Sequence, residues 1–176
     1  MTTTALANKL LFSTYSVGAD FRTSDHLCLL PVYFRQEFSD GNHRDGGALK
    51  LLLSPYDLPN TTSALGAEIY ARAYNSSLPT TGVYFNPASY RQEQVSLIAI
   101  HQFGPDWRLR AIAGIGSEAI DGSRAQSYAW DVSLRGRLQG NGRLEVHVGR
   151  NSFASMAGGG PGYWNNTATV SVVYPF

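Results

Sequence analysis

Cysteine is almost absent from this chain, and long apolar runs are absent altogether. The single cysteine among 176 residues is Cys28, so no disulfide can form within the chain and no thiolate metal cluster is possible. No apolar stretch approaches the roughly 20 residues that a membrane-spanning helix needs. If the chain enters a membrane, it must therefore do so with β-strands that close into a barrel.

Charge is also scarce and nearly balanced. Charged residues make up 15% of the chain, hydrophobic residues 43%, and the formal net charge is +1. Because no strong field of one sign results, we expect no nucleic-acid partner. The four histidines, His26, His43, His101 and His147, have no second ligand at metal-binding spacing, so we predict no metal site and no cofactor.

What the chain does have is a recurring alternation of apolar and polar residues. Near the C-terminus, Ala168, Val170 and Val172 alternate with Thr167 and Thr169. Side chains alternate between the two faces of a strand, so one face is apolar and the other polar. Outer-membrane strands need this arrangement, with lipid outside and a wet or plugged lumen inside. We expect the polar parity to line that lumen through Glu68, Tyr70, Arg72, Tyr74, Arg108, Arg110, Asp131, Arg135, Arg137, Arg143 and Glu145.

Turn-forming residues divide the chain into roughly nine strand-like segments. We predict strands at Leu10–Phe21, His26–Phe38, Ala48–Pro55, Ser63–Asn75, Tyr90–Phe103, Asp106–Glu118, Ala125–Gln139, Gly142–Asn151 and Thr167–Phe176. The segment Ala48–Pro55 is the weakest, and without it eight strands remain. Asp40–Gly47 has the composition of an exposed loop.

The connections between these segments alternate in length. Phe103–Asp106 and Gln139–Gly142 have the composition of tight turns, whereas Tyr74–Tyr90, Ile120–Gln126 and Asn151–Asn165 are longer. Short turns at one end and long loops at the other are typical of outer-membrane barrels.

We therefore predict an all-β fold, an antiparallel outer-membrane β-barrel. It has about eight strands or is the C-terminal part of a larger barrel. A soluble barrel would instead hide the apolar face inside, and the sequence leaves open which face is inside.

The C-terminal residues resemble the signal by which outer-membrane proteins are recognised for assembly. Tyr174 and the final Phe176 occupy its two aromatic positions, although Pro175 departs from it. The resemblance implies the barrel assembly machinery and outer-membrane lipid as partners. Residues 1–7 lack the basic start and apolar core of an export signal. We therefore expect a single barrel domain over residues 1–176 that is a C-terminal fragment of a longer exported chain.

The stretch Gly82–Tyr90, with Tyr84, Phe85, Asn86 and Pro87 at its centre, is similar to a segment of a known family. The family is that of the tetratricopeptide-repeat exopolysaccharide secretion proteins, with cellulose synthase operon protein C nearest. A turn at Gly104–Trp107, a glycine-rich strand and a terminal phenylalanine add to the resemblance, which covers Leu65–Phe176.

This resemblance implies a bacterial outer-membrane pore that passes a neutral or modified glycan such as cellulose, in biofilm formation. It further implies a periplasmic repeat scaffold, an inner-membrane synthase, and a full barrel of about sixteen strands. We expect no catalysis, and we expect residues 84–87 to form a rim or gate at one strand end.

Two other functions stay open. A small closed barrel with a structural or adhesive role is one. An outer-membrane hydrolase is the other, because His147 shares the polar parity with Asp131 and Ser133 of the preceding segment.

Overall fold

The computed structural model describes residues 10–59, 61–78, 84–138, 141–153 and 163–174. The backbone in these ranges is mostly extended, as the alternation of apolar and polar residues predicts. No helix within them is long and apolar enough to cross a membrane. The strands are β1 (Phe12–Gly18), β2 (Phe21–Ser24), β3 (Leu27–Phe38), β4 (His43–Asp57), β5 (Ser63–Ser76), β6 (Ser89–Phe103), β7 (Trp107–Ile120), β8 (Ser123–Arg137), β9 (Arg143–Phe153) and β10 (Tyr163–Val173).

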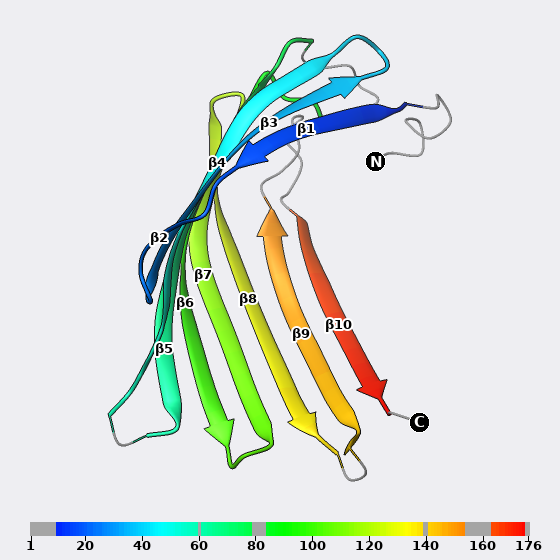
Figure 1. Cartoon of the computed structure of the whole chain (residues 1–176). Helices are drawn as coiled ribbons and strands as arrows, with labels where there is room; N and C mark the ends of the chain where they lie inside the picture. The colour runs from blue at the N-terminus through cyan, green and yellow to red at the C-terminus, as the bar shows by residue number, and fades with distance from the viewer. Residues whose placement is uncertain (1–9, 60, 79–83, 139–140, 154–162, 175–176) are drawn as a thin grey trace.

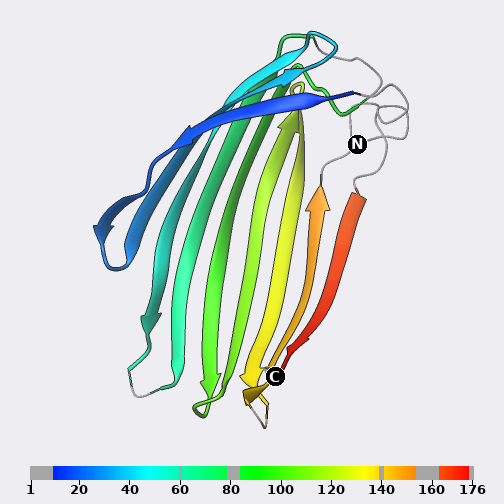
Figure 2. The ribbon, with the colours of Figure 1, turned by 45° about the vertical axis from the view of Figure 1, so that its right-hand side comes forward.

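These strands form one antiparallel sheet of ten strands, which confirms the predicted fold class. From β3 to β10 each strand pairs with the next one along the chain, while β1 and β2 both pair with β3. Figures 1 and 2 show the sheet as a curved wall with β1 and β10 at its two edges. In the described part of the chain these two edge strands do not pair with each other.

A proline explains why the first edge is split into β1 and β2. Both strands follow the same register against β3, with Gly18 opposite Val32 and Phe21 opposite Leu29. Between them, the Ala19 N–H donates to the Pro31 carbonyl over 3.1 Å. Pro31 has no N–H to return toward this edge, so the ladder is interrupted here. We therefore treat β1 and β2 as one strand position in the wall.

The strand β4 corrects the prediction for the region around residue 45. Asp40–Gly47 is not a loop, because the chain turns at residues 39–42 and β4 begins at His43 and runs for 15 residues. Gly41 closes the turn with a φ of 86°, a conformation that glycine adopts without strain. Ala48–Pro55 is thus part of a long strand, and the eight-strand count is wrong.

The connection between β7 and β8 is also shorter than predicted. Instead of the longer segment Ile120–Gln126, two residues make the turn, Asp121 with a φ of 50° and Gly122 with a φ of 85°. Positive φ at both central positions defines the type I′ turn that suits a two-residue hairpin. The tight turn after Phe103 is confirmed, whereas residues 139 and 140 of the other predicted turn lie outside the described residues.

Away from the turn end, the polar face of the curved sheet is the more buried one and the apolar face is the more exposed one. Neighbouring residues on β6 show this, since Leu97 is 68% exposed and Ile98 is 3% exposed. The side chains that share a face with Ile98 include the buried Phe34, Tyr74 and Ser96. Side chains converge on a concave surface and splay on a convex one, so the buried polar face is the concave face. This answers the question that the sequence left open.

Glycines make room where the concave face is most crowded. A Cβ on Gly114 would lie 2.3 Å from the Ser96 hydroxyl, and one on Gly116 would lie 2.1 Å from the Glu93 carbonyl oxygen. Real side chains do not fit at such distances. The glycine-rich strand therefore reflects close packing of β7 against β6.

Candidate functional site

The residues predicted to line a lumen share the concave face. The pairing of successive strands places Arg72 beside Gln92, Arg108 beside Arg135, and Arg135 beside Glu145. The strand register places the other predicted residues on this same face, between apolar residues that point to the other face. On this face lie Glu68, Tyr70, Arg72, Tyr74, Arg108, Arg110, Asp131, Arg135, Arg137, Arg143 and Glu145. Their role in lining a passage stays a prediction.

Asn42 holds the connector between β5 and β6 against the loop end of the sheet. Its side chain is only 1% exposed, and its amide donates to the Tyr84 hydroxyl over 2.8 Å and to the Asn86 side-chain oxygen over 2.9 Å. Its oxygen accepts from the Ser77 hydroxyl over 3.1 Å and from the Leu78 backbone N–H over 2.9 Å. One buried side chain thus bonds to both ends of the connector.

Further contacts fix the same connector. The Tyr84 hydroxyl donates to the Asp40 carboxylate over 3.0 Å, and burial raises the pKa of this phenol. Arg44 donates to the Phe85 carbonyl and to the Asn86 side chain. The segment predicted as a rim or gate is therefore bonded to the turn between β3 and β4.

Aromatic rings and two arginines surround this connection. The Arg44 guanidinium lies 4.8 Å from the centre of the Phe38 ring and 5.3 Å from that of Tyr74. Tyr74 stacks on Tyr90 with 4.9 Å between ring centres, and Arg72 also lies over the Tyr74 ring. A cation that lies over an aromatic face is attracted by the quadrupole of the ring. The loop end of the concave face thus carries flat apolar surfaces beside hydrogen-bond donors.

Sequence reasoning missed Asn42, Arg44 and Phe38 as site residues. Arg44 was missed because the wrong loop prediction for Asp40–Gly47 removed the first residues of β4 from the alternating pattern. Once β4 begins at His43, Arg44 shares the concave face with Lys50, and Lys50 pairs with Glu68 over 3.1 Å.

In the middle of the face, Asp131 contacts His147. The carboxylate oxygen of Asp131 meets Nε2 of the imidazole, and Ser133 is the direct cross-strand neighbour of His147. Within the described ranges the Ser133 side chain makes no hydrogen bond to His147. The groups of the hydrolase hypothesis are thus close together, but the link between nucleophile and base is not formed, and that hypothesis stays a prediction.

The turn end of the concave face is rich in arginine. Arg108, Arg135, Arg137 and Arg143 line an open hollow of about 680 Å³ between the ends of β6 to β9. Arg135 donates to both carboxylate oxygens of Glu145, over 2.9 and 3.0 Å. The other arginines of this hollow have no ion pair among the described residues.

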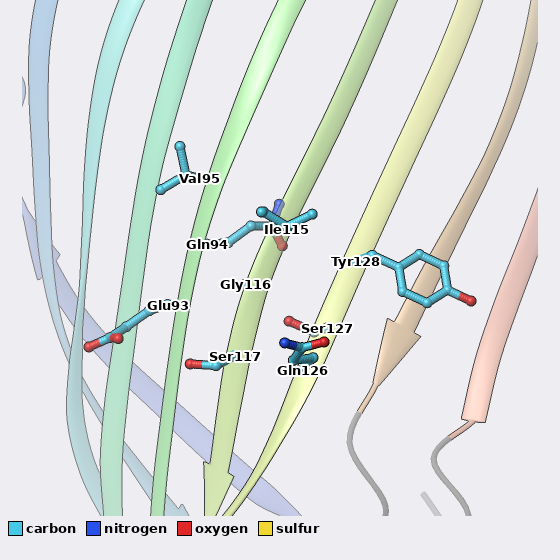
Figure 3. Close-up of a pocket in the computed structure, with 9 residues that line it drawn as sticks. All are labelled: Glu93, Gln94, Val95, Ile115, Gly116, Ser117, Gln126, Ser127 and Tyr128. Atoms are coloured by element: carbon cyan, nitrogen blue, oxygen red, sulfur yellow. The ribbon is translucent and has the colours of Figure 1, made fainter.

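The convex face changes from apolar to charged toward the loop end. A shallow hollow there has Val95, Ile115 and Tyr128 on one side, as Figure 3 shows, and Glu93 on the other. Glu93 pairs with Arg91 and, over 3.5 Å, with Arg124. On the convex face, apolar side chains are thus bordered by charged ones at the loop end.

The predicted assembly signal is only partly described. Tyr174 follows the end of β10, is 49% exposed, and lies against Gly142, where an added Cβ would come within 2.8 Å of the ring. Phe176 lies outside the described residues.

Comparison with known proteins supports the fold. No protein-family model matches the chain, and no curated protein matches it by sequence. One solved structure that it resembles is described as "Bacterial polysaccharide outer membrane secretin", with a TM-score of 0.81 and 12% sequence identity. The match covers 98% of this chain and 59% of that one, so this chain spans less than two thirds of the matched chain. At this identity the likeness shows the fold alone.

Proposed function

We propose that this chain forms part of the wall of a bacterial outer-membrane β-barrel through which a polysaccharide is exported. The observation that carries the proposal is the inverted distribution of polarity. The large apolar side chains Leu97, Ile115 and Val170 are 68%, 75% and 68% exposed on the convex face, while charged groups gather on the concave one. Exposed apolar surface of this extent is costly in water and favourable in lipid.

The concave face suits a polymer of sugars. Sugar rings have apolar faces that stack on aromatic side chains, and the half-buried Tyr70 lines a hollow of the concave face beside Lys50 and Arg72. The hydroxyl groups of a sugar can exchange hydrogen bonds with the polar residues farther down the face. Conduction needs contacts that are favourable but weak and repeated, which a row of exposed polar side chains supplies. A glycan such as cellulose, which the family resemblance implies, would follow this path.

The segment Tyr84–Pro87 would act as a fixed rim of the passage. Asn42 and Arg44 hold it from two sides, so it narrows the loop end without swinging. The two open sheet edges would be paired with further strands, because unpaired backbone groups are too costly in hydrocarbon. We thus propose that the chain is part of a larger barrel, with outer-membrane lipid and the assembly machinery as partners.

The three tryptophans provide a direct test of which face meets lipid. Trp107, Trp130 and Trp164 all lie on the convex parity. In the barrel purified from native membranes and placed in vesicles, brominated lipid should quench their fluorescence strongly, and aqueous acrylamide should quench it weakly. The reverse result would show that the apolar face is not in lipid and would end the proposal.

A second measurement addresses transport. The same barrel in a planar bilayer should show discrete conductance steps that oligosaccharides interrupt, since they occupy the passage. A barrel that inserts but conducts nothing, with or without oligosaccharide, would support the closed structural barrel instead.

A further inference from the structure

Five arginines gather at one end of the concave face. They are Arg108 and Arg110 on β7, Arg135 and Arg137 on β8, and Arg143 on β9. All five lie within a few residues of the tight turns, at the end opposite to the connector held by Asn42. The opposite end carries the aromatic groups, so the two ends of the face differ in chemistry.

The arginines face one another directly across the strands. Arg108 is the cross-strand neighbour of Arg135, and Arg137 is that of Arg143. Like charges in directly opposed positions destabilise a sheet. Two such pairs side by side would weaken the sheet unless an anion from outside neutralises them.

The carboxylates of the described residues pair with only one arginine of this cluster. Glu145 is engaged by Arg135, and Asp131 farther up the face contacts His147. Asp106 in the adjoining turn lines the hollow but forms no ion pair within the described residues. Among the described residues, four of the five arginines therefore have no ion-pair partner.

We propose that this cluster binds the carboxylates of an acidic polysaccharide, a polymer of uronic acids, where it enters the passage. The inference rests on the proposed export function and gives its substrate a charge that the family resemblance, with its neutral or modified glycan, does not. Guanidinium groups bind carboxylates in a bidentate manner, and arginines on adjacent strands stand about 4.8 Å apart, so they can bind successive charges along a chain.

The geometry also favours passage over capture. The arginines are exposed, as Arg135 at 59% shows, and their hollow is open, so water and salt screen each contact. Several weak contacts of this kind attract an acidic polymer and let it slide from one site to the next.

The test compares three probes on the barrel purified from native membranes. Fluorescence anisotropy would measure the binding of labelled oligogalacturonate, with a neutral cello-oligosaccharide of equal length and inorganic phosphate as competitors. The double variant R108Q/R143Q removes two arginines that have no ion pair. The matched control R91Q/R124Q removes two arginines from the convex face.

We expect oligogalacturonate to bind in a salt-dependent manner, about tenfold more weakly in R108Q/R143Q and unchanged in R91Q/R124Q. Equal competition by the neutral oligosaccharide would overturn the inference, as would unaltered binding in R108Q/R143Q. Competition by inorganic phosphate at comparable concentration would assign the cluster to a phosphate-bearing ligand and would likewise overturn it. If the double variant does not fold, the probe competition and salt dependence on the unmodified barrel still decide.

The pore proposal and this inference can fail separately. A barrel that conducts and is blocked equally by acidic and neutral oligosaccharides would retain the pore and exclude the acidic substrate. A barrel that binds oligogalacturonate as expected but never conducts would retain acidic-ligand binding at the arginine cluster and exclude the pore.

Discussion

Replacing Asn42 with alanine should release the connector between β5 and β6. The side chain forms four hydrogen bonds, two as a donor to Tyr84 and Asn86 and two as an acceptor from Ser77 and Leu78. Among the described residues outside the connector, it is the one whose side chain forms hydrogen bonds to both ends of the connector. Its removal therefore tests whether the rim is fixed by this residue.

The size of the effect depends on what the partners can do without Asn42. Tyr84 still donates to Asp40, and Asn86 still accepts from Arg44, so neither is left without a partner. Only the Leu78 N–H loses its partner entirely. With a net value of about 0.5–1.5 kcal/mol for each hydrogen bond and partial replacement by water, we expect a loss of about 2 kcal/mol in the free energy of unfolding.

Two assays check this result on the barrel purified from native membranes and placed in lipid vesicles. Urea titration followed by tryptophan fluorescence gives the free energy of unfolding. Limited digestion with chymotrypsin reports whether the backbone after Tyr84 or Phe85 has become accessible, and we expect cleavage in the variant but not in the unmodified chain.

The control is Asn75→Ala, because Asn75 is exposed at the end of β5. We expect it to change stability by less than about 0.5 kcal/mol and to leave the connector protected. If Asn42→Ala behaves like this control in both assays, the connector is held by something else and the reasoning fails.

Three further substitutions test the sheet itself. Val170→Arg should destabilise the inserted chain by about 2–4 kcal/mol because it places a charge in lipid, whereas Thr169→Arg on the concave face should cost far less; equal costs would contradict the assignment of faces. Gly116→Ala should cost about 1–3 kcal/mol by urea titration, since its Cβ would meet a backbone carbonyl at 2.1 Å, and Gly47→Ala, with its nearest atom at 3.1 Å, should cost less. Gly122→Ala should cost about 1 kcal/mol because its φ is 85°, and a neutral result would exclude the type I′ turn.

The sequence predicts the strands well wherever both faces alternate cleanly. The segments around β5, β7 and β8 were identified with errors of a few residues at their ends, because alternation depends on local residue order alone. The assignment of the apolar face to the outside could not be predicted, because a strand of a soluble barrel has the same alternation of apolar and polar residues.

The β4 error has a structural cause. Gly46 and Gly47 have turn composition, yet both lie within β4. Position 46 requires a glycine because a Cβ there would lie 2.4 Å from the Ala73 carbonyl oxygen. Pro55 looks like a strand end but lies where the register of β4 against β5 shifts between Leu53 and Tyr56. Gly46 and Pro55 both pack against β5. A local sequence pattern cannot predict such contacts between strands.

The contacts of the connector could not be predicted from the sequence either. Asn42 and Asn86 are 44 residues apart, and neither belongs to a motif that requires the other. The resemblance at Gly82–Tyr90 indicated that this segment matters, but it did not identify its anchor. Such polar contacts arise only after the sheet has brought the two turns together.

The direction of the strands restricts how the wall can close. With β1 and β2 taken as one position, nine positions alternate in direction, so β1 and β10 run the same way. A second copy in the same orientation would meet this one with two parallel seams, whereas an odd number of other strands would close it with antiparallel pairs throughout. We therefore expect every second amide of β10 to exchange slowly with deuterium in the native barrel and rapidly in the refolded chain alone. If these amides are protected in the isolated chain too, the wall closes on its own, and the requirement for an odd number of added strands is wrong.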